Sequence, residues 1–449
     1  MGSLLGTLAT LLVLLLGGAF ALPHFIDWDD HKAIFEQQLE RVAGRKVSVG
    51  GRVNLALLPV PELSFEKVRF AHAGGDFADP FAEVDSFAME LSLPALLSGK
   101  LEAKSVSLVR PLLRLNVDEK GQGNWTDIGT LDPSLPFVPR DVALNAVVIE
   151  EGRVEIVNVR SSLPLRIEAI NGEFAADSLK GPFRFSGSAM LNGSRQDIRL
   201  AAGQVQAGSS RIKATLKSAA SGLQTQFDGD LSGFTGPLTY TGVVTAKAPF
   251  GRIAPGGTAP APPQVLDITA KSVISPEKIE LTDITATLGE DIRPQIFTGE
   301  AVFNLAGAGR LDASLSTRWF DATPIAGDGD LPRLLGDLRL AMGEMIAALP
   351  VATAEGRVLF KADQIGLGEE TLRQAEISLE IRPRSKPGLS VKALAPGETA
   401  VSLSGALESG EGAAAGNGFS GRIDLNLSLI HISEPTRLLS ISYAVFCLK

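Results

Sequence analysis

Alternation of apolar and polar side chains is clearest in Phe183-Arg-Phe-Ser-Gly-Ser-Ala-Met-Leu-Asn-Gly-Ser-Arg-Gln-Asp-Ile-Arg-Leu200. A period of two predicts β-strands with one apolar face, and the Gly and Asn residues between such segments are typical of hairpin turns. Similar segments recur from Lys46 to Leu403, spaced by about 10 to 15 residues through much of that range. The sequence therefore predicts a mainly β fold, built as a long, curved, largely antiparallel sheet.

Two segments depart from this pattern and predict helices. In the first, one face carries an apolar side chain at every third or fourth position: Phe35, Leu39 and Val42. Asp29 or Asp30 is expected to accept the first free backbone N–H groups, and Gly44 is placed to end the helix. The second helix is expected over residues 333–349, between two prolines, and should pack on a sheet face.

So few helices leave most of the apolar sheet surface uncovered. Burying that surface is worth roughly 25 cal/mol per Å², so the sheet must take it out of water in some other way. It could pack on a second sheet, close into a barrel, or curl into a trough that holds an apolar ligand. Composition does not choose between these three arrangements.

The N-terminal residues form an apolar run. No residue from Gly2 to Leu22 is charged, and at about 1.5 Å per residue the run can cross a hydrocarbon core of roughly 30 Å. We expect residues 1–24 to be an uncleaved membrane anchor; the alternative is a signal peptide cleaved after Ala19-Phe-Ala21. In either case the body of the protein is exported. The residues expected in or beside the bilayer are Leu4, Leu8, Leu11, Leu12, Val13, Leu14, Leu15, Leu16, Phe20 and Trp28.

Residues 427–449 differ in kind from the rest of the chain. Leu427-Ser-Leu-Ile-His-Ile-Ser-Glu-Pro-Thr-Arg437 resembles the translation of an adapter used to build sequencing libraries, and Ile441-Ser-Tyr-Ala-Val-Phe-Cys-Leu448 resembles its second fixed block. A processing scar is excluded from fold reasoning. We therefore expect the natural sequence to depart from this one near Asn426.

A family resemblance lies between Asp27 and Asp127. After the anchor come Trp28 and the amphipathic helix, and four further motifs follow: Gly44-Arg-Lys-Val-Ser-Val-Gly-Gly51, Leu58-Pro-Val-Pro61, Ser107-Leu-Val-Arg-Pro-Leu-Leu-Arg-Leu115, and Asp118 with Gly123-Asn-Trp125. Together they resemble the N-terminal part of the AsmA family. Later blocks such as Gly356-Arg-Val-Leu-Phe-Lys361 are more weakly similar to the C-terminal repeats of that family.

This resemblance implies a function in the cell envelope. It implies an anchor in the inner membrane, a body in the periplasm and a part in outer-membrane assembly. It also implies similarity to bridge-like lipid transfer proteins, in which a curved β-sheet offers an apolar groove to acyl chains. Together with the composition of the chain, it gives the expected segments: 1–24 (anchor), 25–127 (N-terminal AsmA-like module), 128–250 (second β-rich segment), 251–264 (Pro/Gly linker), 265–426 (third β-rich segment) and 427–449 (adapter-derived).

Composition and motifs argue against other functions. A net charge of −9 is unsuited to capturing nucleic acid. One cysteine and four histidines, without H-x-x-x-H or C-x-x-C spacing, leave little material for a transition-metal site, and no Ser/His/Asp set is evident. We therefore expect no enzyme activity, no cofactor and no metal.

The leading hypothesis is a lipid-sheltering protein whose partners are the inner-membrane bilayer, phospholipid and further envelope proteins. Outside the anchor, its candidate groove residues are Val154, Ile156, Phe183, Phe185, Ile198 and Leu200. Their shared facing depends on strand register, because a slip of one residue moves a side chain to the other face. The alternative hypothesis is a closed β-sandwich scaffold that assists outer-membrane protein assembly and binds no lipid.

Overall fold

A computed structural model describes most of the chain from Asp27 to Asn426. The described residues are 27–72, 75–92, 94, 103–125, 144–159, 165–176, 181–191, 193–234, 236–250, 264–289, 294–307, 309–321, 355–367, 370–382, 388–408 and 418–426. The predicted anchor over residues 1–24, the predicted helix over residues 333–349 and the adapter-like residues 427–449 lie outside them. Within the described residues, no helix has the length and apolar character needed to span a membrane.

The first predicted helix is confirmed. A short 3-10 helix, η1 (Trp28–His31), leads into α2 (Lys32–Ala43), and Gly44 ends α2 at a φ of 67°, donating its N–H to the Glu40 carbonyl. The predicted cap was wrong, because Asp27 rather than Asp29 or Asp30 accepts a free N–H at the start of η1. Asp29 is instead turned toward the sheet, where its carboxylate accepts from a strand N–H.

The strands fall into two compact units. The first holds β1 (Val47–Val49), β2 (Val53–Ala56), β3 (Glu62–Phe70), β4 (Ala82–Leu91), β5 (Ala103–Val109), β6 (Leu112–Val117), β7 (Leu144–Asn158), β8 (Leu165–Ala176), β9 (Phe183–Leu191), β10 (Ser194–Ala202) and β11 (Ser209–Ser218). The second holds β13 (Thr239–Phe250), β14 (Gln264–Ile274), β15 (Lys278–Leu288), β16 (Gln295–Asn304), β17 (Arg310–Asp321), β18 (Glu355–Leu367), β19 (Glu370–Ile381), β20 (Gly388–Ala395), β21 (Thr399–Glu408) and β22 (Gly418–Asn426). Strand β12 (Gln224–Ser232) is divided between the two units.

Pairing in the first unit is largely antiparallel between successive strands, as predicted. β1 and β2 both pair with β3, so they act as one edge strand interrupted at Gly50 and Gly51. β3 pairs with β4, and the ladder continues from β7 through β8, β9 and β10 to β11. The exception is β7, which runs parallel to both β5 and β6.

The second unit has the same plan. Its strands pair antiparallel in chain order from β13 to β22, except that β17 and β18 are parallel. A parallel pair cannot be joined by a tight hairpin and needs a longer connection. Each parallel pair accordingly follows a long segment between strands, residues 118–143 before β7 and residues 322–354 before β18.

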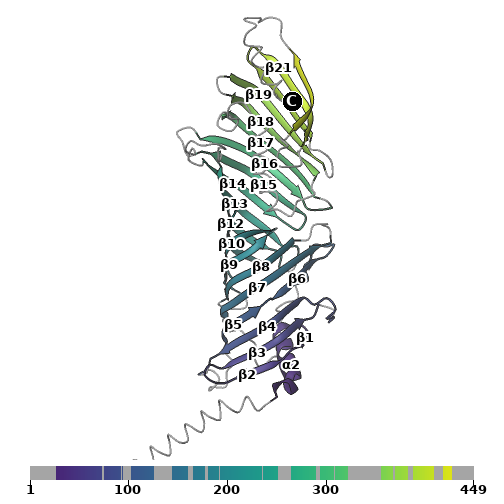
Figure 1. Cartoon of the computed structure of the whole chain (residues 1–449), viewed down its shortest axis with the longest axis vertical. Coiled ribbons are helices and arrows are strands. Elements are labelled where there is room, and N and C mark those ends of the chain that lie inside the picture. Colours follow the sequence, from purple (N-terminus) through teal and green to yellow (C-terminus); the bar gives the residue numbers. More distant parts are fainter. Residues whose placement is uncertain are drawn as a thin grey trace, which may run out of the picture. The chain divides into compact units, whose positions relative to one another are not determined.

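Within each unit the described strands form a single layer. Extensive close approach between backbones occurs only between hydrogen-bonded neighbours, and between η1 or α2 and the edge strands β1 and β2. Figure 1 shows the strands of each unit side by side, with α2 beside β1. The fully buried cluster of the first unit lies under this helix and includes Val47, Val53, Phe65 and Val68, with Phe35 and Leu39 of α2 packed on it.

Candidate functional site: an uncovered apolar sheet face

The register places four of the candidate groove residues on one face of β9 and β10. Residues directly opposite each other in a ladder lie on the same face of a sheet. Phe185 is opposite Leu200, and Ile198 lies two residues before Leu200 on the same strand. Phe183 lies two residues before Phe185, so all four side chains share this face.

Val154 and Ile156 on β7 share the same face, although the connection is indirect. Val154 is opposite Ile167 on β8, and Ile167 is opposite Leu191 on β9. Leu191 lies six residues from Phe185 on an unbroken strand, so both face the same way. Ile156 follows Val154 by two residues, and its facing is therefore the same.

A β-bulge makes this shared facing possible. Phe174 is opposite Phe185, yet it lies seven residues from Ile167, an odd separation that would normally put the two on opposite faces. The register of β8 shifts between Glu168 and Asn171, and Ala169 has a φ of 47°. One extra residue restores the facing, so the apolar face continues across the bulge.

The face is only half-covered. All six candidate residues are half-buried, while the positions between them on β9 and β10 are exposed and mostly charged: Arg184, Ser186, Asp197 and Arg199. The six apolar side chains therefore stay partly exposed to water, and none of them belongs to a buried cluster within the described residues. This leaves an apolar surface on one side of the layer and a charged surface on the other.

Glycines shape the centre of this face. A Cβ on Gly187 would lie 2.2 Å from the Asn171 carbonyl oxygen, and a Cβ on Gly172 would lie 2.5 Å from that of Ser186, so the two strands approach too closely for a side chain. The Phe185 ring reaches over both glycines, within 3.1 Å of where either Cβ would stand. The Phe185 ring thus lies over the two glycines and forms part of the apolar surface itself.

Phe174 is a site residue that sequence reasoning missed. Its ring stacks on that of Phe183, with centroids 6.0 Å apart and planes inclined by 23°. The interruption of alternation at the β8 bulge hid it, because counting by twos from Ile167 assigns Phe174 to the opposite face. The glycine at position 172 was the available signal, since glycine within a strand often marks a bulge or a close approach.

The second unit carries an equivalent face that the sequence reasoning did not single out. A row of residues directly opposite one another crosses its strands from β15 to β21: Ile284, Gly299, Leu315, Phe360, Ile377, Val391 and Leu403. Beside Leu315 the rings of Phe297, Phe320 and Phe360 form a cluster, with centroids 5.6 to 6.1 Å apart. Large apolar surface in a single layer is therefore a property of both units.

The motifs that carry the family resemblance build local structure. The guanidinium of Arg45 is buried over the Phe81 ring, 4.4 Å from its centroid, and donates to the Asn124 carbonyl oxygen at 2.5 Å. The Asn124 amide in turn accepts from the Asn116 N–H at 3.1 Å and donates to the Arg114 carbonyl at 3.0 Å. Gly44-Arg45 and Gly123-Asn-Trp125 thus join the end of α2 to β6.

Trp28, predicted beside the bilayer, packs on the buried cluster under α2, with its ring centroid 6.2 Å from that of His31. This contact accounts for its place in the motif, and its predicted role at the membrane surface stays a prediction. The other predicted anchor residues lie outside the described residues.

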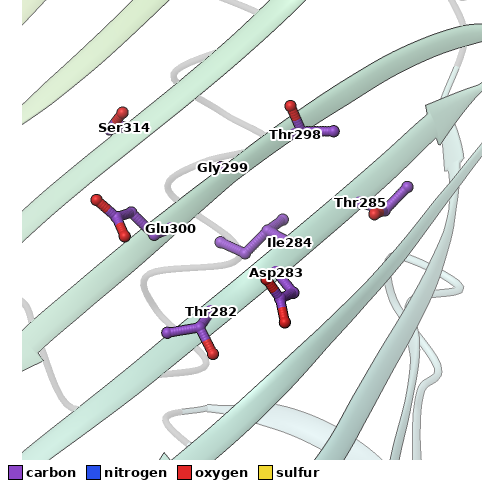
Figure 2. A pocket seen from close by; sticks show the side chains of 8 residues that line it. All are labelled: Thr282, Asp283, Ile284, Thr285, Thr298, Gly299, Glu300 and Ser314. Atoms are coloured by element: carbon purple, nitrogen blue, oxygen red, sulfur yellow. The ribbon is translucent and has the colours of Figure 1, made fainter.

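A shallow depression of about 620 Å³ lies over β15, β16 and β17 of the second unit. Figure 2 shows its lining residues on β15, β16 and β17: Thr282, Asp283, Ile284, Thr285, Thr298, Gly299, Glu300 and Ser314. Asp283 is exposed, and its Oδ2 lies 2.8 Å from Lys271 Nζ. The hydrogen bond between the two side chains raises the pKa of Lys271. No group of three or more metal-ligating side chains occurs in the described part of the chain.

A family model described as the AsmA family matches residues 3–231, just over half of the chain, from the predicted anchor into β12. No curated protein and no solved structure matches. The matched range contains all six candidate groove residues.

Proposed function

This chain belongs to the AsmA family, whose members are membrane-associated envelope proteins, and from that premise we propose that it shelters phospholipid on its apolar sheet face during transfer between membranes. In this proposal residues 1–24 anchor the chain in the inner membrane and the sheet extends into the periplasm. Outer-membrane biogenesis is the process it serves. Lipid and the bilayer are its partners, and the function needs neither a catalytic group nor a cofactor.

The observation that carries the proposal is the single-layer sheet with one half-buried apolar face. An acyl chain laid on this face exchanges water for apolar contact at about 0.8 kcal/mol per CH₂. The face is continuous from Val154 on β7 to Leu200 on β10, because the bulge at Ala169 preserves its facing. The opposite, charged face keeps the same strands soluble.

The alternative, a closed β-sandwich scaffold, receives less support. Such a scaffold would bury its apolar face against a second sheet within a unit, as paired sheets do at a separation of about 10 Å. In the first unit the described strands belong to one hydrogen-bonded sheet, and the six candidate residues are half-buried where the core of a sandwich would bury them. Protein partners at the apolar face remain the competing outcome of the experiment.

Site-specific photo-crosslinking tests the proposal with a matched control on one strand. A benzoylphenylalanine at Leu200 presents the probe on the apolar face, and the same residue at the neighbouring Arg199 presents it on the exposed face. We expect phospholipid adducts in cells from Leu200 and none above background from Arg199. Equal lipid labelling at both positions, or protein adducts without lipid at Leu200, would contradict the proposal.

A further inference from the structure

The first edge of the sheet has an unusual arrangement of backbone donors. β1 and β2 pair only with β3 among the described strands, so one side of each has no strand neighbour. The Gly50 N–H donates to Lys67 of β3 at 3.0 Å, and the Arg52 carbonyl accepts from Glu66 of β3. Because donors alternate in direction along a strand, the N–H groups of Val47, Val49 and Val53 point away from β3.

Each of these three outward N–H groups donates to a carboxylate. The Val49 N–H lies 2.7 Å from Glu36 Oε1, and the Val47 N–H lies 3.1 Å from Glu40 Oε1. The Val53 N–H lies 2.9 Å from Asp29 Oδ1. Two acceptors come from α2 and the third from η1, so a helical segment occupies donors that a further β-strand would use.

The spacing of the two elements explains why one helix can serve two strand positions. Glu36 and Glu40 are one helical step of four residues apart, about 6 Å along the axis. Val47 and Val49 are one strand step of two residues apart, about 6.8 Å. The helix runs antiparallel to the strand, since Glu36 meets Val49 and Glu40 meets Val47. The turn at Gly44 sets this direction.

Apolar packing holds the carboxylates in place. Phe35 and Leu39 lie next to Glu36 and Glu40 in the sequence and pack on the buried cluster, with the Phe35 and Phe65 ring centroids 5.6 Å apart. Lys32 pairs with Asp29 at 3.2 Å and so holds the third acceptor. One stripe of α2 thus covers the apolar face while the adjacent stripe closes the edge.

We propose that Glu36, Glu40 and Asp29 close the first edge of the sheet against strand addition, and that without them a second copy of this chain adds to β1 and β2 edge to edge. An unprotected edge strand is a template for pairing with another chain, and the same edge in a second copy is its ready complement. Hydrogen bonds to ionised acceptors are stronger than those between neutral groups, so these carboxylates compete well with an incoming strand. The inference does not depend on lipid binding.

The experiment uses the full chain in detergent micelles, with Cys447→Ser and Ser48→Cys introduced so that β1 carries the only thiol. In Glu36→Ala/Glu40→Ala we expect amide exchange across residues 47–53 to rise about ten-fold at low protein concentration. At high concentration a short bis-maleimide should link two copies through the Ser48→Cys thiols. Both effects should be absent when the two glutamates are retained.

Two further variants make the result decisive. Asp30→Ala/Glu119→Ala removes the same charge from exposed side chains and should behave like the parent. Glu36→Gln/Glu40→Gln removes the charge but keeps an acceptor oxygen at each position, so its exchange should rise less than that of the alanine pair. If the alanine pair matches the Asp30/Glu119 control in exchange and crosslinking, the proposal is overturned. The alanine pair could fail to fold. In that case the folded glutamine pair and the single variant Glu36→Ala replace it. The proposal is overturned if both of these show the same amide exchange and the same crosslinking as the parent.

Discussion

The strands beneath α2 and the strands from β8 to β11 have similar apolar alternation but different surroundings. Beneath the helix, Phe65 and Val68 are each only 1% exposed. On β9 and β10, Phe185 and Leu200 remain half-buried and belong to no buried cluster of the described residues. The two regions belong to one unit and one ladder, so the difference arises from what covers the sheet.

The same alternation of apolar and polar side chains therefore produces two different surfaces in one unit. Under α2 the apolar face is a core, and its burial stabilises the fold. On β7 to β10 the apolar face is left available, which is the condition that an apolar ligand needs. Variants in the two regions should therefore differ in their effects on stability and on lipid capture.

The largest expected effect is on the covered region. Phe65→Ala should lower the free energy of unfolding of the first unit by about 3–5 kcal/mol, because it empties a fully buried site between β3 and α2. Phe185→Ala should cost clearly less, since its ring is already half in water. Urea unfolding followed by circular dichroism would measure both. Equal losses would mean that the two regions are equally covered.

Next in size is the effect of crowding the glycine pair. Gly187→Ala should destabilise the first unit by about 1–3 kcal/mol, because the added Cβ would meet backbone of β8 at 2.2 Å. Gly236→Ala is the matched control, since nothing lies within 4 Å of its Cβ position. The same unfolding measurement applies, and a neutral Gly187→Ala would show that the strands can separate without cost.

A smaller stability effect should accompany a large functional one at Leu200. Leu200→Asn places a polar group on the uncovered face and should change the free energy of unfolding by about 1 kcal/mol or less, because little burial is lost. Lipid captured by a photo-crosslinker at the adjacent apolar position, Ile198, should nevertheless fall several-fold. The control Arg199→Asn alters the other face and should leave capture unchanged.

The smallest expected effect is a pH dependence at the covered edge. The hydrogen bond from the Val53 N–H holds the pKa of Asp29 below its ordinary value of 3.8. A carboxyl whose pKa is lower in the folded state stabilises the fold above its unfolded pKa and loses that contribution as the pH falls through the folded pKa.

The stability difference between the parent and Asp29→Ala should therefore be constant at neutral pH and shrink below about pH 3.8. Acid unfolding curves of the two proteins would measure it. Asp30→Ala serves as the control, and a difference that persisted unchanged into strong acid would contradict the role of the Asp29 carboxylate.

Much of the architecture could be predicted from local patterns. The alternation from Lys46 onward predicted the strands, and the Phe35 and Leu39 spacing with Gly44 predicted α2 and its end. The shared facing of Phe183, Phe185, Ile198 and Leu200 followed from the period of two within each strand and the register of one hairpin. Facing within a strand is local, because successive side chains alternate by backbone geometry alone.

Other features depended on contacts between distant residues. The bulge at Ala169 inverted the count along β8 and hid Phe174, because the pairing with β9 decides where an extra residue is accommodated. Asp29 looked like a helix cap but accepts from Val53 instead, and a local rule cannot foresee an acceptor that a later strand supplies. Glu36 and Glu40 accept from Val49 and Val47 of β1, and a local pattern in α2 cannot foresee partners that a later strand supplies.

By itself, then, the sequence determined that this is a mainly β chain with one-sided strands and a short amphipathic helix near its start. Those properties follow from side-chain periodicity and turn residues, which act over a few positions. Tertiary structure alone decided which apolar face is a core and which is left uncovered, and that α2 closes the first edge. The packing of α2 on the sheet and its contacts with the edge strands both join residues that are far apart in the chain. A pattern of a few neighbouring residues therefore does not encode them.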